Sequence, residues 1–347
     1  MIDHEKFSNN VKNILVVGKN NQVGDMICSL PLYAALKKKY PDCNITLVAA
    51  KTNYPIPIKE INKYIDNVIT LDRSSLKTNV AFLKELRKTK YQIGIVPSTI
   101  TLSSTSHIVN YLSGAKIRVG VKNIEGKKNK TAYLLNVKSS FDWDKNKTHQ
   151  KERNLDVVKQ IDCDLTADEL KNIKIKIDKE GETFANEYIR TNFPKKEKLI
   201  VGVHPGAGKL ENIWNVENFK SLIKRLNDKY SPYFLITAGH TDKTAINNLF
   251  LSLKEYNIEY QLAQNIEFKK LAALLNRVNL YITNDTGPMH IADSVGGNVL
   301  ALFGPTNSYE WGPRRKSCFS IQSHTKKIND ITVDKVFDKS VEMLKKK

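Results

Sequence analysis

An aspartate stands where the first predicted strand of the chain gives way to the first predicted helix. The strand covers residues 13–18, and Asp25 follows it, directly after Gly24. A carboxylate at the carboxyl edge of a parallel sheet can take a proton from a substrate hydroxyl. The structural alternative is that Asp25 caps the helix by accepting hydrogen bonds from its first N–H groups. The glycine spacing here is not Gly-x-Gly-x-x-Gly, so this segment does not predict a dinucleotide site.

A glycine-containing loop in the second half of the chain could face an anion. It reads His204-Pro-Gly206-Ala-Gly, follows a predicted strand and ends at Lys209. Backbone amides that glycines leave uncovered between a strand and a helix can donate hydrogen bonds to a phosphate. An ordinary strand-to-helix connection is the structural alternative.

The segment Asn284-Asp-Thr-Gly-Pro-Met-His290 carries the strongest chemical pattern. It predicts the end of a strand, a turn and the first turn of a helix, in which proline is tolerated. Amides near Thr286 and Gly287 would then point outwards at a helix N-terminus, which attracts anions. Asp285 can accept hydrogen bonds from sugar hydroxyls, and His290 lies one turn into the helix. Capping residues and a buried histidine would explain each position singly.

The elements that hold these residues alternate between short apolar strands and helices. Such a rhythm predicts an α/β fold with two doubly wound, Rossmann-like domains and a ligand cleft between them. We expect an N-terminal domain over residues 1–185, a C-terminal domain over 186–332 and a closing helix over 333–347. Residues 122–150 are polar and lose the rhythm, so we expect a mobile segment there. The strands are expected at 13–18, 45–49, 68–71, 93–96, 116–120, 199–203, 233–237, 280–283 and 299–303, and the principal helices at 26–40, 149–162, 216–229, 269–277 and 333–344.

Composition narrows the class of protein. Apolar residues make up 41% of the chain, which is enough for two cores and excludes a disordered or collagen-like protein. No apolar run reaches membrane-spanning length and the first residues do not resemble a secretory signal, so we expect a cytoplasmic protein. The four cysteines lack disulfide or zinc spacing. The 55 Lys and Arg residues outnumber the 36 Asp and Glu residues, and the resulting net charge of +19 favours an anionic partner. The structural alternative is that these lysines form solvated surfaces without a partner. No nucleic-acid-binding module is present in the pattern, so nucleic acid is not the expected partner.

The motifs together resemble glycosyltransferase family nine, the heptosyltransferases. The resemblance is carried by segments spread over residues 13–313, and the part from Asn284 to Thr306 is the most specific. It implies the GT-B fold, whose two Rossmann-like domains face one another. The segments are Gly24-Asp25, Ser29-Leu-Pro31, Tyr40-Pro41, His204-Pro-Gly206, Asn284-Asp-Thr-Gly-Pro-Met-His290, Leu302-Phe-Gly-Pro-Thr306 and Trp311-Gly-Pro313.

The resemblance also implies a reaction, in which a heptose moves from ADP-heptose to a lipopolysaccharide core with inversion and without a metal or other cofactor. Asp25 falls at the position of the proposed general base, Asp285 at the contact to the donor sugar, and Thr286, Gly287 and His290 at the diphosphate site. An anionic glycolipid acceptor implies peripheral contact with the cytoplasmic face of the inner membrane. The further residues expected to bind the donor are His204, Gly206, Lys209, Asp242, Pro288 and Met289.

One position departs from the family pattern. The family has a lysine two residues before the tryptophan that follows His-Pro-Gly, and this chain has Asn212 before Trp214. Either Lys209 contacts the diphosphate instead or the site works without such a lysine, and we expect the first. Two other classes of function stay open at this point, namely a nucleotide-sugar epimerase or hydrolase of GT-B type and a non-enzymatic protein that binds nucleotide sugars or polyanions.

Overall fold

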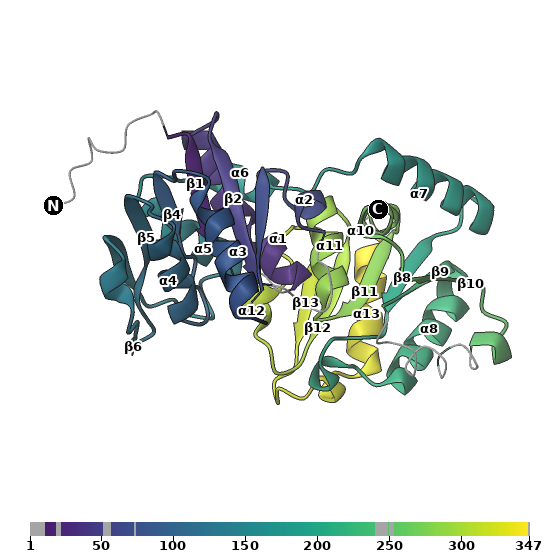
Figure 1. Ribbon diagram of the computed structural model, residues 1–347. Coiled ribbons are helices and arrows are strands. Elements are labelled where there is room, and N and C mark those ends of the chain that lie inside the picture. Colours follow the sequence, from purple (N-terminus) through teal and green to yellow (C-terminus); the bar gives the residue numbers. More distant parts are fainter. Residues whose placement is uncertain are drawn as a thin grey trace. The chain divides into compact units, whose positions relative to one another are not determined.

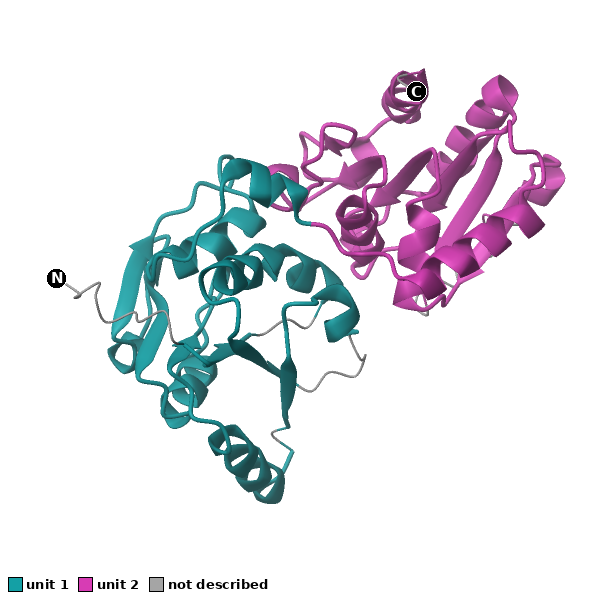
Figure 2. Ribbon diagram, turned by 90° about the horizontal axis from the view of Figure 1, so that it is seen from above, with its two compact units in different colours: residues 1–173 teal, residues 174–347 magenta. Residues whose placement is uncertain are grey.

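The computed structural model of the protein describes residues 11–18, 22–50, 57–72, 74–239, 249 and 253–345. The chain forms two compact units, residues 1–173 and 174–347 (Figure 2). The first unit therefore ends earlier than the expected boundary at 185/186. That boundary falls inside helix α7 (Lys179–Asn192), which packs as a whole against α10 (Phe268–Leu275) of the second unit.

The first unit is built on a mainly parallel sheet in the order β3-β2-β1-β4-β5, with β6 and β7 both paired to β5 (Figure 1). The central strand β1 is continuously apolar, and four of its five residues are buried, as expected for a strand covered on both faces. The strands are β1 (Asn13–Val17), β2 (Asn44–Ala50), β3 (Asn67–Leu71), β4 (Ile93–Ile95), β5 (Ile117–Ile124), β6 (Lys127–Lys128) and β7 (Val137–Phe141).

Helices cover both faces of this sheet. Helix α1 packs against α5, whereas α3 and α4 share a core cluster with β1 and β2 through Phe82, Leu86 and Val109. The chain runs along the sheet from β1 to β3 and then crosses back to β4 and β5. Because the crossovers are right-handed, the helices of the two directions lie on opposite faces of the sheet. The helices are α1 (Val23–Lys39), α2 (Ile58–Ile61), α3 (Leu76–Arg87), α4 (Ser104–Leu112), α5 (Gln150–Lys159) and α6 (Ala167–Asn172), with the short 3₁₀ turn η2 (Ala132–Leu134).

Residues 122–150 are a structured part of the first unit, so the expectation of a mobile segment was wrong. Strand β5 runs on to Ile124 and turns through Glu125 and Gly126, both with positive φ, into β6. Such a two-residue turn suits a tight hairpin. Strand β7 then pairs in parallel with β5. Only one residue of β7 is buried, which explains why the segment carries no apolar run.

The second unit has a fully parallel six-stranded sheet in the order β10-β9-β8-β11-β12-β13. The predicted strands of this half are confirmed, whereas β10 and β13 were not predicted because their residues are mostly half-buried and mixed in character. The strands are β8 (Ile200–His204), β9 (Tyr233–Ala238), β10 (Tyr260–Gln264), β11 (Leu280–Asn284), β12 (Val299–Phe303) and β13 (Phe319–Gln322).

Helix α8 (Val216–Tyr230) shows how the helices of this unit join its core. Its buried residues Phe219, Leu222, Ile223 and Leu226 recur at helical spacing, and the Asn215 side chain caps its first turn. The closing helix α13 (Val333–Lys345) packs against α8 and β11 within the second unit. The remaining elements are α11 (Gly287–Val295), α12 (Ser308–Trp311) and the 3₁₀ turns η3 (Leu210–Asn212) and η4 (Ile328–Asp330).

Candidate functional site

The strand order of the second unit reverses between β8 and β11, which are parallel neighbours. In open α/β sheets, ligands bind at the carboxyl ends of the strands on either side of such a point. Here the buried side chain of Asn284, at the end of β11, holds the loop that follows β8. Its Nδ2 donates to the carbonyls of Pro205 (2.9 Å) and Gly206 (3.1 Å), and its Oδ1 accepts from the Trp214 amide (3.2 Å). The predicted His204–Gly208 and Asn284–His290 segments therefore meet at one edge of the sheet.

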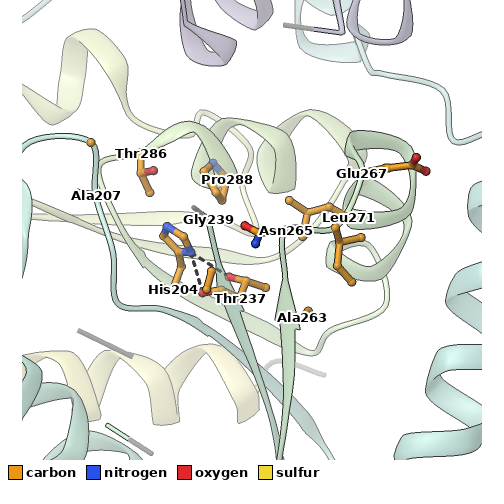
Figure 3. A pocket seen from close by; sticks show the side chains of 13 residues that line it. His204, Ala207, Thr237, Gly239, Ala263, Asn265, Glu267, Leu271, Thr286 and Pro288 are labelled. Atoms are coloured by element: carbon orange, nitrogen blue, oxygen red, sulfur yellow. Dashed lines mark hydrogen bonds between the residues drawn. The ribbon is translucent and has the colours of Figure 1, made fainter. Parts of the chain in front are cut away.

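A pocket of about 490 Å³ opens at this edge. Figure 3 shows Thr286 and Pro288 near one end of it, His204 beside Thr237, and Glu267 with Leu271 near the other end. Its walls come from the loop after β8, the end of β9, the β10–α10 connection and the start of α11. The lining residues are His204, Ala207, Gly208, Thr237, Ala238, Gly239, Ala263, Asn265, Ile266, Glu267, Leu271, Thr286 and Pro288.

His204 is buried in the wall of the pocket. Its Nδ1 lies 3.0 Å from the Thr237 carbonyl and 3.1 Å from the Thr237 hydroxyl. A carbonyl can only accept a hydrogen bond, so the Nδ1 of His204 donates to it. The last residue of β8 is thereby fixed in orientation by the neighbouring strand β9.

Asp285 and Asn212 form a hydrogen-bonded pair beside the loop. The Asn212 Nδ2 donates to the Asp285 Oδ2 over 3.2 Å. Burial raises the pKa of Asp285, and a hydrogen bond from the Thr306 side chain and the positive charge of Lys209 act in the opposite direction. Lys209 is itself exposed and lies within electrostatic reach of Asp285. The residue that departs from the family pattern thus contacts the predicted sugar-binding carboxylate directly.

Helix α11 begins at this edge, as predicted, with Thr286 as its N-cap and Pro288 in its first turn. The Thr286 side chain does not cap the helix. Met289 is fully buried and its amide donates to the Thr286 carbonyl. His290 is 8% exposed, with its ring edge-on to Trp311 at a centroid distance of 6.3 Å. Thr286 and Pro288 line the pocket, whereas Met289 and His290 are buried and do not belong to its lining.

Asp25 belongs to the first unit, where it sits in the first turn of α1. The N-cap of α1 is Gln22, so the alternative in which Asp25 caps the helix is wrong. The Asp25 side chain is half-buried and has neither an ion pair nor a hydrogen bond to another residue that the structure describes. Burial raises the pKa of this carboxyl from 3.8 to about 6. A carboxylate with that pKa is ionised at neutral pH and is a stronger base than an ordinary aspartate.

Three further expectations concern Asp242, a metal site and a membrane-spanning segment. Asp242 lies outside the described residues. Across the described part of the chain, no group of three or more His, Cys, Asp or Glu side chains could hold a metal ion. No described helix is long and apolar enough to cross a membrane.

Sequence reasoning missed the side of the pocket formed by the β10–α10 connection, including Asn265 and Glu267. Strand β10 was not predicted, so nothing placed these residues beside β9. Thr237 was predicted as the end of a strand but not as a partner of His204. Its signal was available, since it ends a strand adjacent to β8 and so lies at the same sheet edge.

Two Rossmann-like units, one of them with a pocket at its switch point, define the chain as an α/β protein with the GT-B type of fold. The family model of glycosyltransferase family 9 (heptosyltransferase) matches residues 79–340. The chain therefore belongs to this family and is a glycosyltransferase.

Curated relatives and a solved structure agree with the family. The chain is 28% identical over 185 residues to lipooligosaccharide heptosyltransferase 2 of Campylobacter jejuni, an alignment that covers 52% of this chain and only 56% of that relative. It is 24% identical over 313 residues to lipopolysaccharide heptosyltransferase 3 of Escherichia coli, covering 84% of this chain and 83% of the relative. The structure of E. coli ADP-heptose LPS heptosyltransferase II is similar with a TM-score of 0.76 and 21% identity, covering 96% of this chain and 99% of that one.

Proposed function

We propose that this glycosyltransferase moves a heptose from ADP-heptose to a lipopolysaccharide core or a related glycan, with inversion at the anomeric carbon and without a metal ion. The observation that carries the proposal is the pocket at the β8/β11 switch point, which Thr286 and Pro288 at the N-terminus of α11 line. Asp285 directly precedes that helix. Membership of the family and the names of the relatives supply the sugar and the acceptor class.

The donor would lie along the pocket of the second unit. Helix N-termini favour anions, so the diphosphate would meet the amides of Thr286 and Gly287, with the Lys209 ammonium beside it. Asp285 would accept hydrogen bonds from sugar hydroxyls. Asn265 and Glu267, towards the other end of the pocket, carry the amide and carboxylate that suit ribose hydroxyls.

The reaction would be a single displacement. The Asp25 carboxylate takes the proton of an acceptor hydroxyl, and the acceptor oxygen forms a bond to the anomeric carbon. The bond from that carbon to the diphosphate oxygen breaks on the opposite side, and ADP leaves with the electron pair. One displacement inverts the anomeric centre, and fixed dipoles and cations around the leaving diphosphate lower the barrier.

The acceptor would be an anionic glycolipid, encountered at the cytoplasmic face of the inner membrane. The net charge of +19 supports this part of the proposal, because a basic surface is attracted to a membrane that carries anionic lipids.

The test is a transfer assay with purified protein, ADP-heptose and a lipopolysaccharide core that lacks the heptose. We expect ADP release only when the acceptor is present, with a gain in acceptor mass by one heptose and inverted linkage stereochemistry. Rapid ADP release without an acceptor would instead identify a hydrolase. Conversion of the donor into an isomer would identify an epimerase, and binding without turnover of any nucleotide sugar would identify a binding protein.

A further inference from the structure

Helices α3 and α4 form one layer over the sheet of the first unit (Figure 1). Their inner residues are buried against β1 and β2 in a common cluster. Arg87, the last residue of α3, donates from Nε to the carbonyl of Leu112 at the end of α4 over 3.1 Å. The two helices are therefore linked at their C-terminal ends, and both present their outer sides away from the sheet.

Large apolar side chains are exposed on this layer and on the neighbouring turn η2. Elsewhere in the unit most apolar side chains of this size are buried. The concentration of exposed ones on this layer therefore needs an explanation. Leu76 and Val80 are one turn apart on α3, and Ile108 and Tyr111 are one turn apart on α4. The exposed fractions are 84% for Leu76, 52% for Val80, 45% for Ile108, 52% for Tyr111 and 76% for Tyr133.

A basic pocket of about 590 Å³ opens between the ends of α3 and α4 and the start of β5. Three cationic side chains line it, those of Arg87, Lys116 and Arg118, and none of its lining residues is acidic. The Arg118 guanidinium is held by the carbonyls of Leu134 (2.7 Å) and Ala115 (2.9 Å) and lies 5.4 Å from the centre of the Tyr111 ring. The pocket thus joins fixed positive charge to an exposed aromatic ring.

This pocket is separate from the position of Asp25. Lys116 and Arg118 lie at the amino end of β5, whereas Asp25 follows the carboxyl end of the parallel strand β1. The two sites therefore occupy opposite edges of one sheet, and the basic pocket is not required for the chemistry proposed above. The α3–α4 layer spans the sheet between these edges, since both helices begin near the carboxyl edge and end near the pocket.

We propose that the outer side of the α3–α4 layer docks on the surface of a lipid bilayer that contains anionic phospholipids. The Arg87–Lys116–Arg118 pocket takes a phosphate headgroup. Ile108 and Tyr111 enter the interface on the side of the pocket, and Leu76 and Val80 enter it towards the other end of α3. Tyr111 and Tyr133 have the apolar ring and polar tip of residues that sit at headgroup depth. The choice of a bilayer over a soluble anion rests on the exposed apolar side chains of the layer, because a free phosphate gains nothing from them.

This inference deepens the proposed function by naming the face that would approach a membrane-bound acceptor. The test of this inference needs no donor and no turnover. The membrane inference can therefore fail while the transferase proposal stands, and the transferase proposal can fail while the protein still binds the membrane. A cation near an anionic bilayer strengthens binding by roughly fivefold, so removal of two should weaken it about 30-fold.

The experiment is sedimentation of the full chain with vesicles of phosphatidylcholine alone or mixed with phosphatidylglycerol. We expect binding to the mixed vesicles only, and about 30-fold weaker binding for the double variant Arg87→Gln/Lys116→Gln. The matched control is Lys196→Gln/Lys254→Gln, which removes two exposed cations from the second unit and should leave binding unchanged. A second variant, Ile108→Ser/Tyr111→Ser, keeps the charge and should also weaken binding, which separates docking from simple attraction.

Three results would overturn the inference. The first is unchanged vesicle binding by both test variants, provided that their thermal unfolding matches the wild type. The second is an equal loss for the pocket variant and the control, which would assign binding to net charge. The third is saturable binding of glycerol phosphate without vesicles that disappears in Arg87→Gln/Lys116→Gln while vesicle binding persists, which would assign the pocket to a soluble anion.

Discussion

The two units carry their functional groups at equivalent sheet edges but hold them by different means. At the β8/β11 edge, Asn284, His204 and Asp285 are each fixed by a hydrogen bond to a neighbouring strand or loop. At the β1 edge, the Asp25 carboxylate has no hydrogen bond to another described residue, and its main perturbation is burial, which raises its pKa to about 6. The first arrangement fixes positions and charge, whereas the second raises basicity.

This difference suits the two halves of the proposed reaction. A leaving diphosphate is stabilised best by dipoles and cations that are already in place when its charge develops. A general base works best when its pKa approaches the working pH, and removing water from a carboxylate achieves that. We therefore expect donor binding to depend on the second unit and proton transfer to depend on Asp25.

Replacement of the base should give the largest effect. Asp25→Asn keeps the size of the side chain but cannot accept the proton, so we expect kcat to fall by about 10²- to 10⁴-fold. The dissociation constant of ADP, measured by calorimetry, should stay unchanged. Near-normal transfer by a folded Asp25→Asn variant would remove Asp25 from the mechanism.

Removal of the Lys209 charge should have the next largest effect, now on the donor side. Lys209→Ala should weaken ADP binding roughly tenfold, the amount expected for one charge-assisted contact. Lys196→Ala is the control, because Lys196 is also exposed in the second unit but does not belong to the loop. Equal small losses in the two variants would show that Lys209 acts only through the general positive field.

The buried Asp25 carboxylate should also lower the stability of the fold at neutral pH. The Asp25 pKa is 3.8 when exposed and about 6 when folded, so the folded chain binds this proton more tightly. The stabilisation that protonated Asp25 provides is complete below about pH 4 and is lost as the pH rises to about 6. Asp25→Asn should therefore raise the free energy of unfolding at neutral pH by at most about 3 kcal/mol. A destabilised variant in chemical denaturation at pH 7 would contradict the cost assigned to the buried charge.

The smallest expected effect is that of a chelator. Asp285 is paired with Asn212 rather than with a second carboxylate, and among the described residues no group of three or more His, Cys, Asp or Glu side chains could hold a divalent ion. Transfer measured with EDTA should equal transfer without it. If EDTA abolished transfer and Mg²⁺ or Mn²⁺ restored it, a metal would take part in the reaction.

Sequence alone predicted the strands that are buried on both faces, because such strands are short, continuous apolar runs. It failed where burial is one-sided, as in β7, β10 and β13, whose residues look polar without their partners. The same failure hid Asn265 and Glu267, which belong to the pocket only because β10 lies beside β9. The Asn284–His290 segment was placed correctly, since a strand end, a turn and a helix start are all encoded within it.

Long-range pairs lay beyond sequence reasoning. Asn212 was noted only as a departure from a pattern, yet its amide holds Asp285, which is far away in the chain. The position of Asp25 inside the first turn of α1 depended on where that helix begins, and helix ends are the least certain part of a sequence-based assignment. The effect of burial on its pKa could only follow from the packing of the first unit.

Donor binding is assigned to the β8/β11 edge and proton transfer to Asp25 at the β1 edge. The most direct test of this assignment compares the pH dependence of wild-type transfer with the pH dependence of donor binding. We expect kcat/KM for the acceptor to fall tenfold for each pH unit below about 6, the pKa of Asp25, and to be level above it. The dissociation constant of ADP-heptose without acceptor should stay constant over the same range. A flat transfer profile, or a loss of donor affinity that accounts for the whole fall in rate, would contradict the assignment of proton transfer to Asp25.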